Sequence, residues 1–120
     1  MVRWIAQPEK LAKEQVRVIR NAVRHGEQLA LSAITLLEIA VLRGMPSRSS
    51  VTELLGAITT DNGFIITPID LDIAAEVAAM GDSLRDPADR VIVATARVRR
   101  LRLVTSDQRI IDSQLVATVA

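Results

Sequence analysis

The sequence predicts an α/β protein with a three-layer α/β/α architecture, in which helices cover both faces of a mostly parallel sheet. Short apolar stretches of strand length alternate along the chain with longer segments of helical periodicity. Apolar residues make up 49% of the chain, yet Trp4 and Phe64 are its only aromatic residues. The core is therefore expected to consist of Val, Ile, Leu and Ala, as in buried parallel strands. A length of 120 residues is enough for one core, so we expect a single domain over residues 1–120.

The elements are expected in the following order along the chain. A helix with an apolar stripe covers 8–24 and is ended by Gly26, and a short buried strand follows at 29–34. Helices are then expected at 36–43 and 51–60, with a loop at 45–50 between them and a turn at 61–63. The remaining elements are a strand at 64–67, helices at 71–80 and 87–100, a strand at 102–105, a turn of helix at 107–111 and a strand at 115–119.

The start of this order is unusual for a doubly wound sheet. The first recognisable element is a helix, and only a stub, residues 1–5, precedes it. Sheets of this kind usually begin with a strand that ends at the centre, because the chain winds outward from it in both directions. We therefore expect the first central strand to be missing or cut short.

Composition excludes several classes of protein. The chain has no cysteine, which fits a reducing compartment and excludes disulfides, thiolate metal sites and cysteine nucleophiles. No apolar run approaches the roughly 20 residues that a membrane span needs, and no signal peptide is visible. We therefore expect a soluble, cytoplasmic protein that does not contact membranes.

A cluster of arginines stands near the C-terminus. Thirteen of the fifteen cations of the chain are arginines, and four of these lie close together at Arg97, Arg99, Arg100 and Arg102. The planar guanidinium group suits phosphate and carboxylate partners, so these residues are weak candidates for binding RNA phosphates. A solvated helix end, at which cations favour the negative pole of the helix dipole, explains the cluster equally well.

Two carboxylates are expected to meet at one edge of the sheet. Asp89 stands in the first turn of a long apolar helix, and Asp107 follows the strand that comes after that helix. A helix of about 12 residues rises ~18 Å and a strand of about five residues returns ~17 Å, so the two acids lie at the same level. This is the carboxyl edge, where open α/β folds place their ligand sites. Glu38, one helical turn after another strand, is a third acid at this edge.

Three acids at one edge favour a bound cation. Carboxylates held close together repel each other unless a cation or a cationic side chain lies between them. Ligand sets made only of oxygen suit Mg²⁺ or Mn²⁺ rather than zinc. Such an ion polarises a phosphoryl group and activates water without any nucleophilic side chain.

Each acid also has a purely structural explanation. Thr35 and Glu38 have the spacing of a capping box, in which the Glu side chain bonds to the N-cap amide. Asp86, followed by Pro87, forms a good helix start, and Asp89 in the same first turn is favoured by the dipole. Asp89 also has a possible salt-bridge partner in the adjacent residue Arg90, and Asp107 is suited to capping a short helical turn.

Other chemistries have little support in the sequence. His25 is the only histidine, which excludes a cluster of histidine metal ligands, and its place at a helix end does not support a Ser-His-Asp relay. The chain has no glycine-rich phosphate loop, and it lacks the aromatic residues that stack on bases.

The strings DPADRVIVATARVRRLRLVTSD and SAITLLEIAVLRG resemble the PIN-domain ribonucleases, and specifically the VapC-type toxins of toxin–antitoxin pairs. The resemblance extends over nearly the whole chain, because WIAQPEKL also resembles the segment that follows the first strand of the family. It implies an α/β/α sandwich, a Mg²⁺- or Mn²⁺-dependent endoribonuclease, a homodimer and a cognate antitoxin. By motif, Glu38, Asp89 and Asp107 match the metal-binding and catalytic acids.

Four further residues have supporting roles in this comparison. Asp86 is a weaker match that supports the site, and Arg90 is expected to buttress the acids. Thr105 and Ser106 are expected to orient Asp107 or a water molecule bound to the metal.

The chain departs from this family at its N-terminus. The family begins with an apolar strand that ends in a metal-binding Asp, whereas this sequence starts at Met1 just past that strand. Several interpretations remain open: a misassigned start of an active ribonuclease, an inactive decayed toxin, and a truncated module that binds an antitoxin without catalysis. A receiver domain is a fourth alternative, but it requires a late lysine, and no lysine follows Lys13.

Overall fold

A computed structural model describes residues 2–7, 13–42 and 63–119 of the chain. Its strands are β1 (Val2–Ala6), β2 (Gln28–Ser32), β3 (Phe64–Thr67), β4 (Arg102–Val104) and β5 (Thr118–Val119). Its helices are α1 (Lys13–Arg24), α2 (Ala33–Leu37), the π-helical segment η2 (Glu38–Leu42), α4 (Leu71–Ala79), α5 (Pro87–Arg99) and α6 (Gln108–Ser113). The loop expected at 45–50, the helix at 51–60 and all but the last residue of the turn at 61–63 lie outside the described residues.

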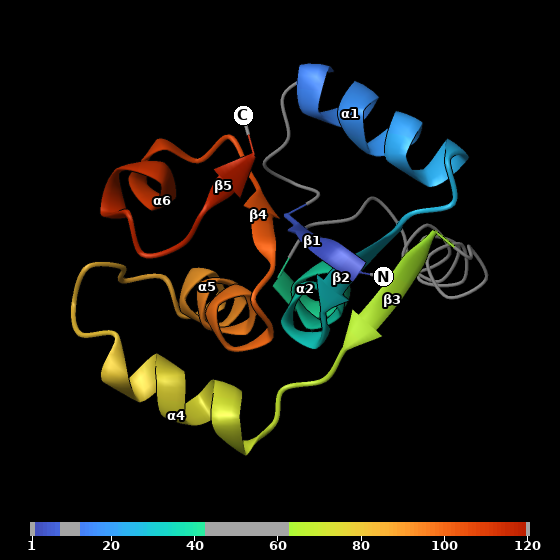
Figure 1. Cartoon of the computed structure of the whole chain (residues 1–120). Coiled ribbons are helices and arrows are strands. Elements are labelled where there is room, and N and C mark those ends of the chain that lie inside the picture. The colour runs from blue at the N-terminus through green and yellow to red at the C-terminus, as the bar shows by residue number, and fades with distance from the viewer. Residues whose placement is uncertain (1, 8–12, 43–62, 120) are drawn as a thin grey trace.

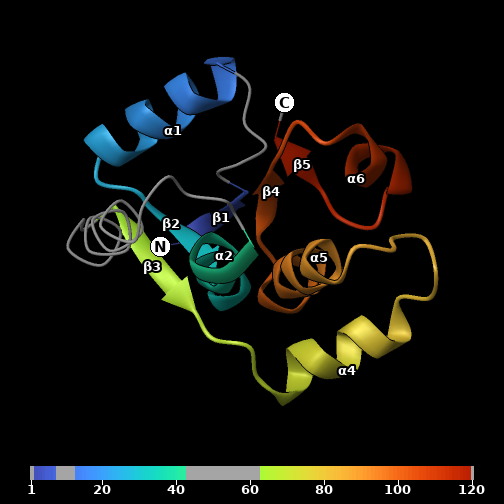
Figure 2. The same ribbon diagram turned by 180° about the vertical axis from the view of Figure 1, so that it is seen from behind.

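The strands form one parallel sheet, which confirms the predicted fold class. The strand order is β3-β2-β1-β4-β5, and each neighbouring pair is parallel. Figure 1 shows α1 on one side of this sheet and α2, α4 and α5 on the other. The view from behind in Figure 2 shows the same three layers.

The centre of the sheet corrects the expectation that the central strand is missing. Residues Val2–Ala6 form β1, which pairs with β2 on one side and with β4 on the other. Ile5 lies opposite Ala30 of β2 and Leu103 of β4, and it is fully buried. The short N-terminal segment is therefore long enough to supply the backbone partners that β2 and β4 need, and neither strand has an unpaired inner edge.

Alternation along the strands divides the core between the two faces of the sheet. Ile5, Ala30 and Leu103 face the larger cluster, which α5 fills with Ile92, Val93 and further small apolar residues. Ala6, Leu29 and Leu31 face the smaller cluster, which packs against Ile19 and Val23 of α1 and includes both aromatic residues. Helix α5 is thus buried in the larger layer, whereas α1 covers the other face alone among the described helices.

Local sequence signals explain most of the observed boundaries. Asp86 is the N-cap of α5, and its side chain accepts a hydrogen bond from the amide of Ala88 at 2.9 Å, with Pro87 next in the chain. Helix α1 ends before Gly26, whose φ of +82° is readily adopted only by glycine. The last strand was expected at 115–119 and is shorter in the structure, where β5 covers only Thr118–Val119. None of the helices in the described segments combines the length and hydrophobicity that crossing a bilayer requires.

Candidate active site

The carboxyl edge of the sheet gathers residues from three separate parts of the chain. Gln7 follows the central strand β1, Thr105 follows β4, and Asp107 begins α6 shortly after it. Asp89 comes to the same edge from the first turn of α5, because that helix runs back from this edge to the start of β4. This edge is where parallel α/β sheets bind their ligands.

Asp89 is held in place by a neutral side chain. It is 4% exposed, although it carries a carboxyl group. Its Oδ1 accepts a hydrogen bond from Nε2 of Gln7 at 2.8 Å, and Gln7 is itself fully buried. Its Oδ2 lies 4.0 Å from Nη2 of Arg109. A buried carboxylate therefore has one oxygen bonded to the central strand and the other directed to a cation.

Both oxygens of Asp107 contact Arg109, because Nε of the guanidinium group also donates to Oδ1 at 3.4 Å. Asp107 is the N-cap of α6, and its Oδ1 accepts a hydrogen bond from the amide of Arg109 at 2.9 Å. Its Oδ2 accepts from Nη2 of Arg109 at 3.2 Å. The capping role considered from the sequence is therefore observed, yet it uses only one oxygen.

Arg109 joins these two acids. The same Nη2 atom contacts Asp107 and lies within ion-pair distance of Asp89, while the arginine side chain remains 74% exposed. The hydrogen bond from Arg109 to Asp107 and the charges of Asp107 and Asp89 raise the pKa of the guanidinium group above its ordinary value. The structure therefore places a positive charge between two carboxylates whose side chains are only 6% and 7% exposed.

A buried hydrogen-bond network connects the two acids through the protein. The hydroxyl of Thr105 donates to Oε1 of Gln7 at 2.6 Å and accepts from the amide of Asp107 at 3.1 Å. Thr105 thus holds the main chain of Asp107. Gln7 and Arg109 were missed by sequence reasoning. Interpreting Val2–Ala6 as a strand would have placed Gln7 at this edge, and Arg109 stands in the first turn that Asp107 caps.

Glu38 lies in a different local structure from the one that a capping box requires. The N-cap of α2 is Ser32, whose hydroxyl accepts from the amide of Ile34, so Thr35 lies inside the helix. The capping-box explanation of Glu38 is therefore wrong. Instead, Glu38 is half-buried and opens the π-helical segment η2, a rare conformation that is frequent at functional sites.

Thr35 on α2 has a buried hydroxyl group that lacks a hydrogen-bond partner among the described residues. Leaving a buried hydroxyl unsatisfied costs about 1–3 kcal/mol, so a water molecule or a ligand is expected there. Glu38 follows one helical turn later on the same helix face.

The supporting residues predicted from the sequence differ in what they contact. Asp86 caps α5. Arg90 donates hydrogen bonds to the carbonyls of Val77 at 2.7 Å and Leu84 at 2.8 Å and also to that of Gly81, so it braces the segment between α4 and α5. Ser106 is exposed beside Asp107.

The predicted arginine cluster is largely bonded within the protein. Arg97 forms an ion pair with Glu76 at 2.9 Å, and Arg99 pairs with Asp70. Arg102 donates to the carbonyl of Thr118 at 3.2 Å. Arg100 ends α5 in the left-handed conformation, with φ of 57°.

The donor set only partly forms a metal site. Two nearly buried carboxylates that already face a cation suit a hard divalent ion such as Mg²⁺ or Mn²⁺. Among the described residues, however, no three His, Cys, Asp or Glu side chains lie close enough together to hold a metal ion. The structure thus brings Asp89 and Asp107 together without gathering Glu38 into one group with them.

The fold and this edge define a class: an α/β protein with a parallel sheet and an acidic site at its carboxyl end. The PIN domain family matches residues 1–113, and the chain belongs to this family. The ribonuclease VapC22 of Mycobacterium tuberculosis (strain ATCC 25618 / H37Rv) is 34% identical over 115 residues, which cover 89% of this chain and 81% of that protein.

Solved structures with the same fold cover nearly the whole chain. VapBC2 from Rickettsia felis, bound to a DNA fragment from their promoter, has a TM-score of 0.74 at 12% identity and covers 99% of this chain and 98% of its own. DNA-bound VapBC from Salmonella typhimurium has a TM-score of 0.70 at 15% identity, with 99% and 98% covered. FitAcB from Neisseria gonorrhoeae has a TM-score of 0.68 at 21% identity, with 100% and 97% covered.

Proposed function

We propose that this protein is a Mg²⁺- or Mn²⁺-dependent endoribonuclease toxin that hydrolyses RNA and is neutralised by a cognate antitoxin. The observation that carries the proposal is the pair Asp89 and Asp107, whose buried carboxylates meet at one cation on the carboxyl edge of the sheet. The kinship with a protein named as a ribonuclease supports RNA as the substrate.

The roles of individual residues follow from their contacts. Asp89, Asp107 and Glu38 would hold the divalent ion, which polarises a phosphoryl oxygen and activates water when it is bound. Gln7 and Thr105 keep the two aspartates in place through their buried hydrogen bonds. Arg109 balances the charge of Asp89 and Asp107, and its exposed side chain can turn away toward solvent when another cation takes that role.

The partners proposed from these relatives are an antitoxin protein and a second copy of the chain. Two of the structural neighbours are named as VapBC assemblies and one as FitAcB, which supports an antitoxin as the protein partner. We further propose that the protein acts as a homodimer in the cytoplasm, where its RNA substrate is present.

The proposed activity is tested by incubating the purified chain with single-stranded RNA and Mn²⁺, with EDTA as the metal-free control. Asp89→Asn and Asp107→Asn should each reduce cleavage by more than the roughly 10–100-fold that loss of an outer-shell partner causes. The matched control is Asp72→Asn, which removes an exposed acid from the first turn of α4 and should leave cleavage unchanged.

The outcomes separate the proposal from its alternative. If neither the wild-type chain nor a version extended by upstream codons cleaves RNA with Mn²⁺, the ribonuclease proposal fails. The neutral side chain of Gln7 at the end of the central strand favours a second candidate, a PIN domain that only binds an antitoxin. That module would co-purify with a small partner protein, and Asp89→Asn would leave the association intact.

A further inference from the structure

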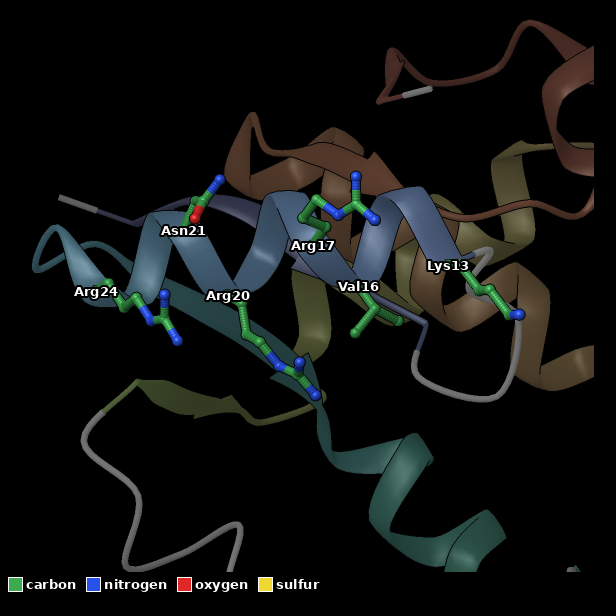
Figure 3. A pocket seen from close by; sticks show the side chains of 6 residues that line it. All are labelled: Lys13, Val16, Arg17, Arg20, Asn21 and Arg24. Atoms are coloured by element: carbon green, nitrogen blue, oxygen red, sulfur yellow. The ribbon is translucent and has the colours of Figure 1, made fainter.

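Helix α1 presents one face made almost entirely of cations. Lys13, Arg17, Arg20 and Arg24, here called the α1 basic stripe, are spaced four, three and four residues apart. At 3.6 residues per turn these positions fall within about 60° of one another, and together they extend about 16 Å along the helix. All four side chains are exposed and line a surface hollow of about 390 Å³ (Figure 3).

The cations of this stripe differ from those of α5 in their partners. Within the described parts of the chain, none of the four forms an ion pair, whereas Arg97 and Arg99 on α5 do. The helix dipole explains Arg24, which stands in the last turn, but it disfavours Lys13 at the first residue. Like charges three and four residues apart also repel each other. The stripe is therefore a row of cations that no acid of the described segments neutralises.

The start of α1 is bonded to a strand end near the candidate active site. The buried Gln15 on the opposite face of α1 donates hydrogen bonds to the carbonyls of Thr105 at 2.7 Å and Val119 at 3.0 Å. Thr105 is the residue that holds the main chain of Asp107. The first turn of α1 is thus bonded to the strand end that leads to Asp107, and about one helix diameter, roughly 10 Å, separates the stripe from it.

The chemistry of the stripe fits a phosphate backbone rather than bases. Guanidinium groups form forked hydrogen bonds with phosphate oxygens, and three of the four cations are arginines. Trp4 and Phe64, the only aromatic residues of the chain, pack against the core cluster beneath α1 and do not join the stripe. Without stacking side chains, binding depends on charge and is independent of base sequence.

We propose that the α1 basic stripe binds the phosphates of single-stranded RNA and leads the strand to Asp89 and Asp107. This inference rests on the proposed ribonuclease function, because it assigns to that site the surface that brings in its substrate. It places RNA binding on α1 instead of on the arginine cluster at the end of α5.

The test measures RNA affinity separately from cleavage. The full chain with Asp89→Asn is titrated, in EDTA, into a fluorescent oligouridylate of about 15 nucleotides, and anisotropy gives Kd between about 50 and 200 mM salt. Each phosphate contact contributes about −0.7 to the slope of log K against log salt for single strands, so Arg17→Gln with Arg20→Gln should reduce the slope by about 1.4. With equal affinity at 1 M salt, this corresponds to about 25-fold weaker binding at 0.1 M.

The matched variant, Arg99→Gln with Arg102→Gln, removes two charges from the arginine cluster at 97–102. It should change Kd by less than about 2-fold. Circular dichroism verifies that each variant is folded. An unchanged slope in the α1 variant, or an equal loss in both variants, would overturn the proposal. Tighter binding of poly-glutamate than of oligouridylate would also overturn it, in favour of an acidic protein partner. If RNA binds through the stripe but the wild-type chain does not cleave it with Mn²⁺, the proposed function fails and the binding surface remains.

Discussion

Helices α1 and α5 are both rich in arginine, yet their cations have different surroundings. On α5, Arg90 is bonded to three carbonyls, and Arg97 and Arg99 pair with acids of the α4 region. On α1, Arg17 and Arg20 point to solvent from a helix that covers its face of the sheet alone among the described helices. The hydrogen bond between Asp70 and the amide of Ile73, assisted by Arg99, also lowers the pKa of Asp70 below its ordinary value.

The difference shows that the density of cations in the sequence does not identify a binding surface. The four arginines between 97 and 102 are closer together in the chain than the cations of α1. Three of them are nevertheless bonded to their own protein. A cation is available to a partner when the fold gives it no acid or carbonyl to bind, and this depends on what packs beside the helix.

Arg90→Met should produce the largest change in stability. It removes hydrogen bonds from a charged donor to three carbonyls in the segment before α5. We expect the free energy of unfolding to fall by about 2–3 kcal/mol, as measured by urea denaturation. Arg17→Met is the control on α1 and should change stability by less than about 0.5 kcal/mol. Equal losses in the two variants would remove the distinction between the helices.

The ion pair between Arg97 and Glu76 should contribute less to stability than the hydrogen bonds of Arg90, because both of its side chains are partly exposed to solvent. A double-mutant cycle with Arg97→Gln and Glu76→Gln is expected to give a coupling free energy of about 0.2–1 kcal/mol. The coupling should decrease with added salt. A coupling of zero at low salt would show that Glu76 does not hold Arg97, and would leave the hydrogen bond from Arg97 to the carbonyl of Leu115 as its contact within the described residues.

Arg20→Gln should give the smallest change in stability, and this change should be an increase. Arg20 has like charges three residues before it and four residues after it on the same face. Removing its charge should raise the free energy of unfolding by about 0.2–0.5 kcal/mol, measured by thermal denaturation in low salt. A decrease in stability would show that Arg20 makes a favourable contact in the folded protein, contrary to the proposed role of the stripe.

Local signals predicted much of the fold. The Asp86–Pro87 start of α5 and the strand at 64–67 were found because capping residues and β-branched runs act over a few neighbours. The central strand was missed because Val2–Ala6 is short and contains Arg3, and it becomes a strand only by pairing with β2 and β4. The capping box considered for Thr35 and Glu38 does not form, because the end of β2 at Ser32, which decides where α2 begins, is set by sheet pairing with β3.

The candidate site was predictable to a similar extent. The lengths of α5 and β4 were enough to place Asp89 and Asp107 at one edge, and the structure brings both to Arg109. Gln7 was not chosen from the sequence, because the strand before it was missed and its importance comes from contacts with residues 82 and 98 positions away. Which residues hold a metal, and the role of Glu38 in particular, remain predictions for the experiments above.

The buried network at the sheet edge has a direction. The amide of Asp107 donates to Thr105, the hydroxyl of Thr105 donates to Gln7, and the amide of Gln7 donates to Asp89. Because each link is a donor toward the next, the Gln7 amide cannot turn end over end unless the Thr105 hydroxyl turns as well, and the backbone of Asp107 opposes that turn. Hydrogen bonds arranged in such a series also strengthen one another. The orientation of the Asp89 carboxylate is therefore set by the main chain of Asp107, through a series of buried donors at the edge of the sheet.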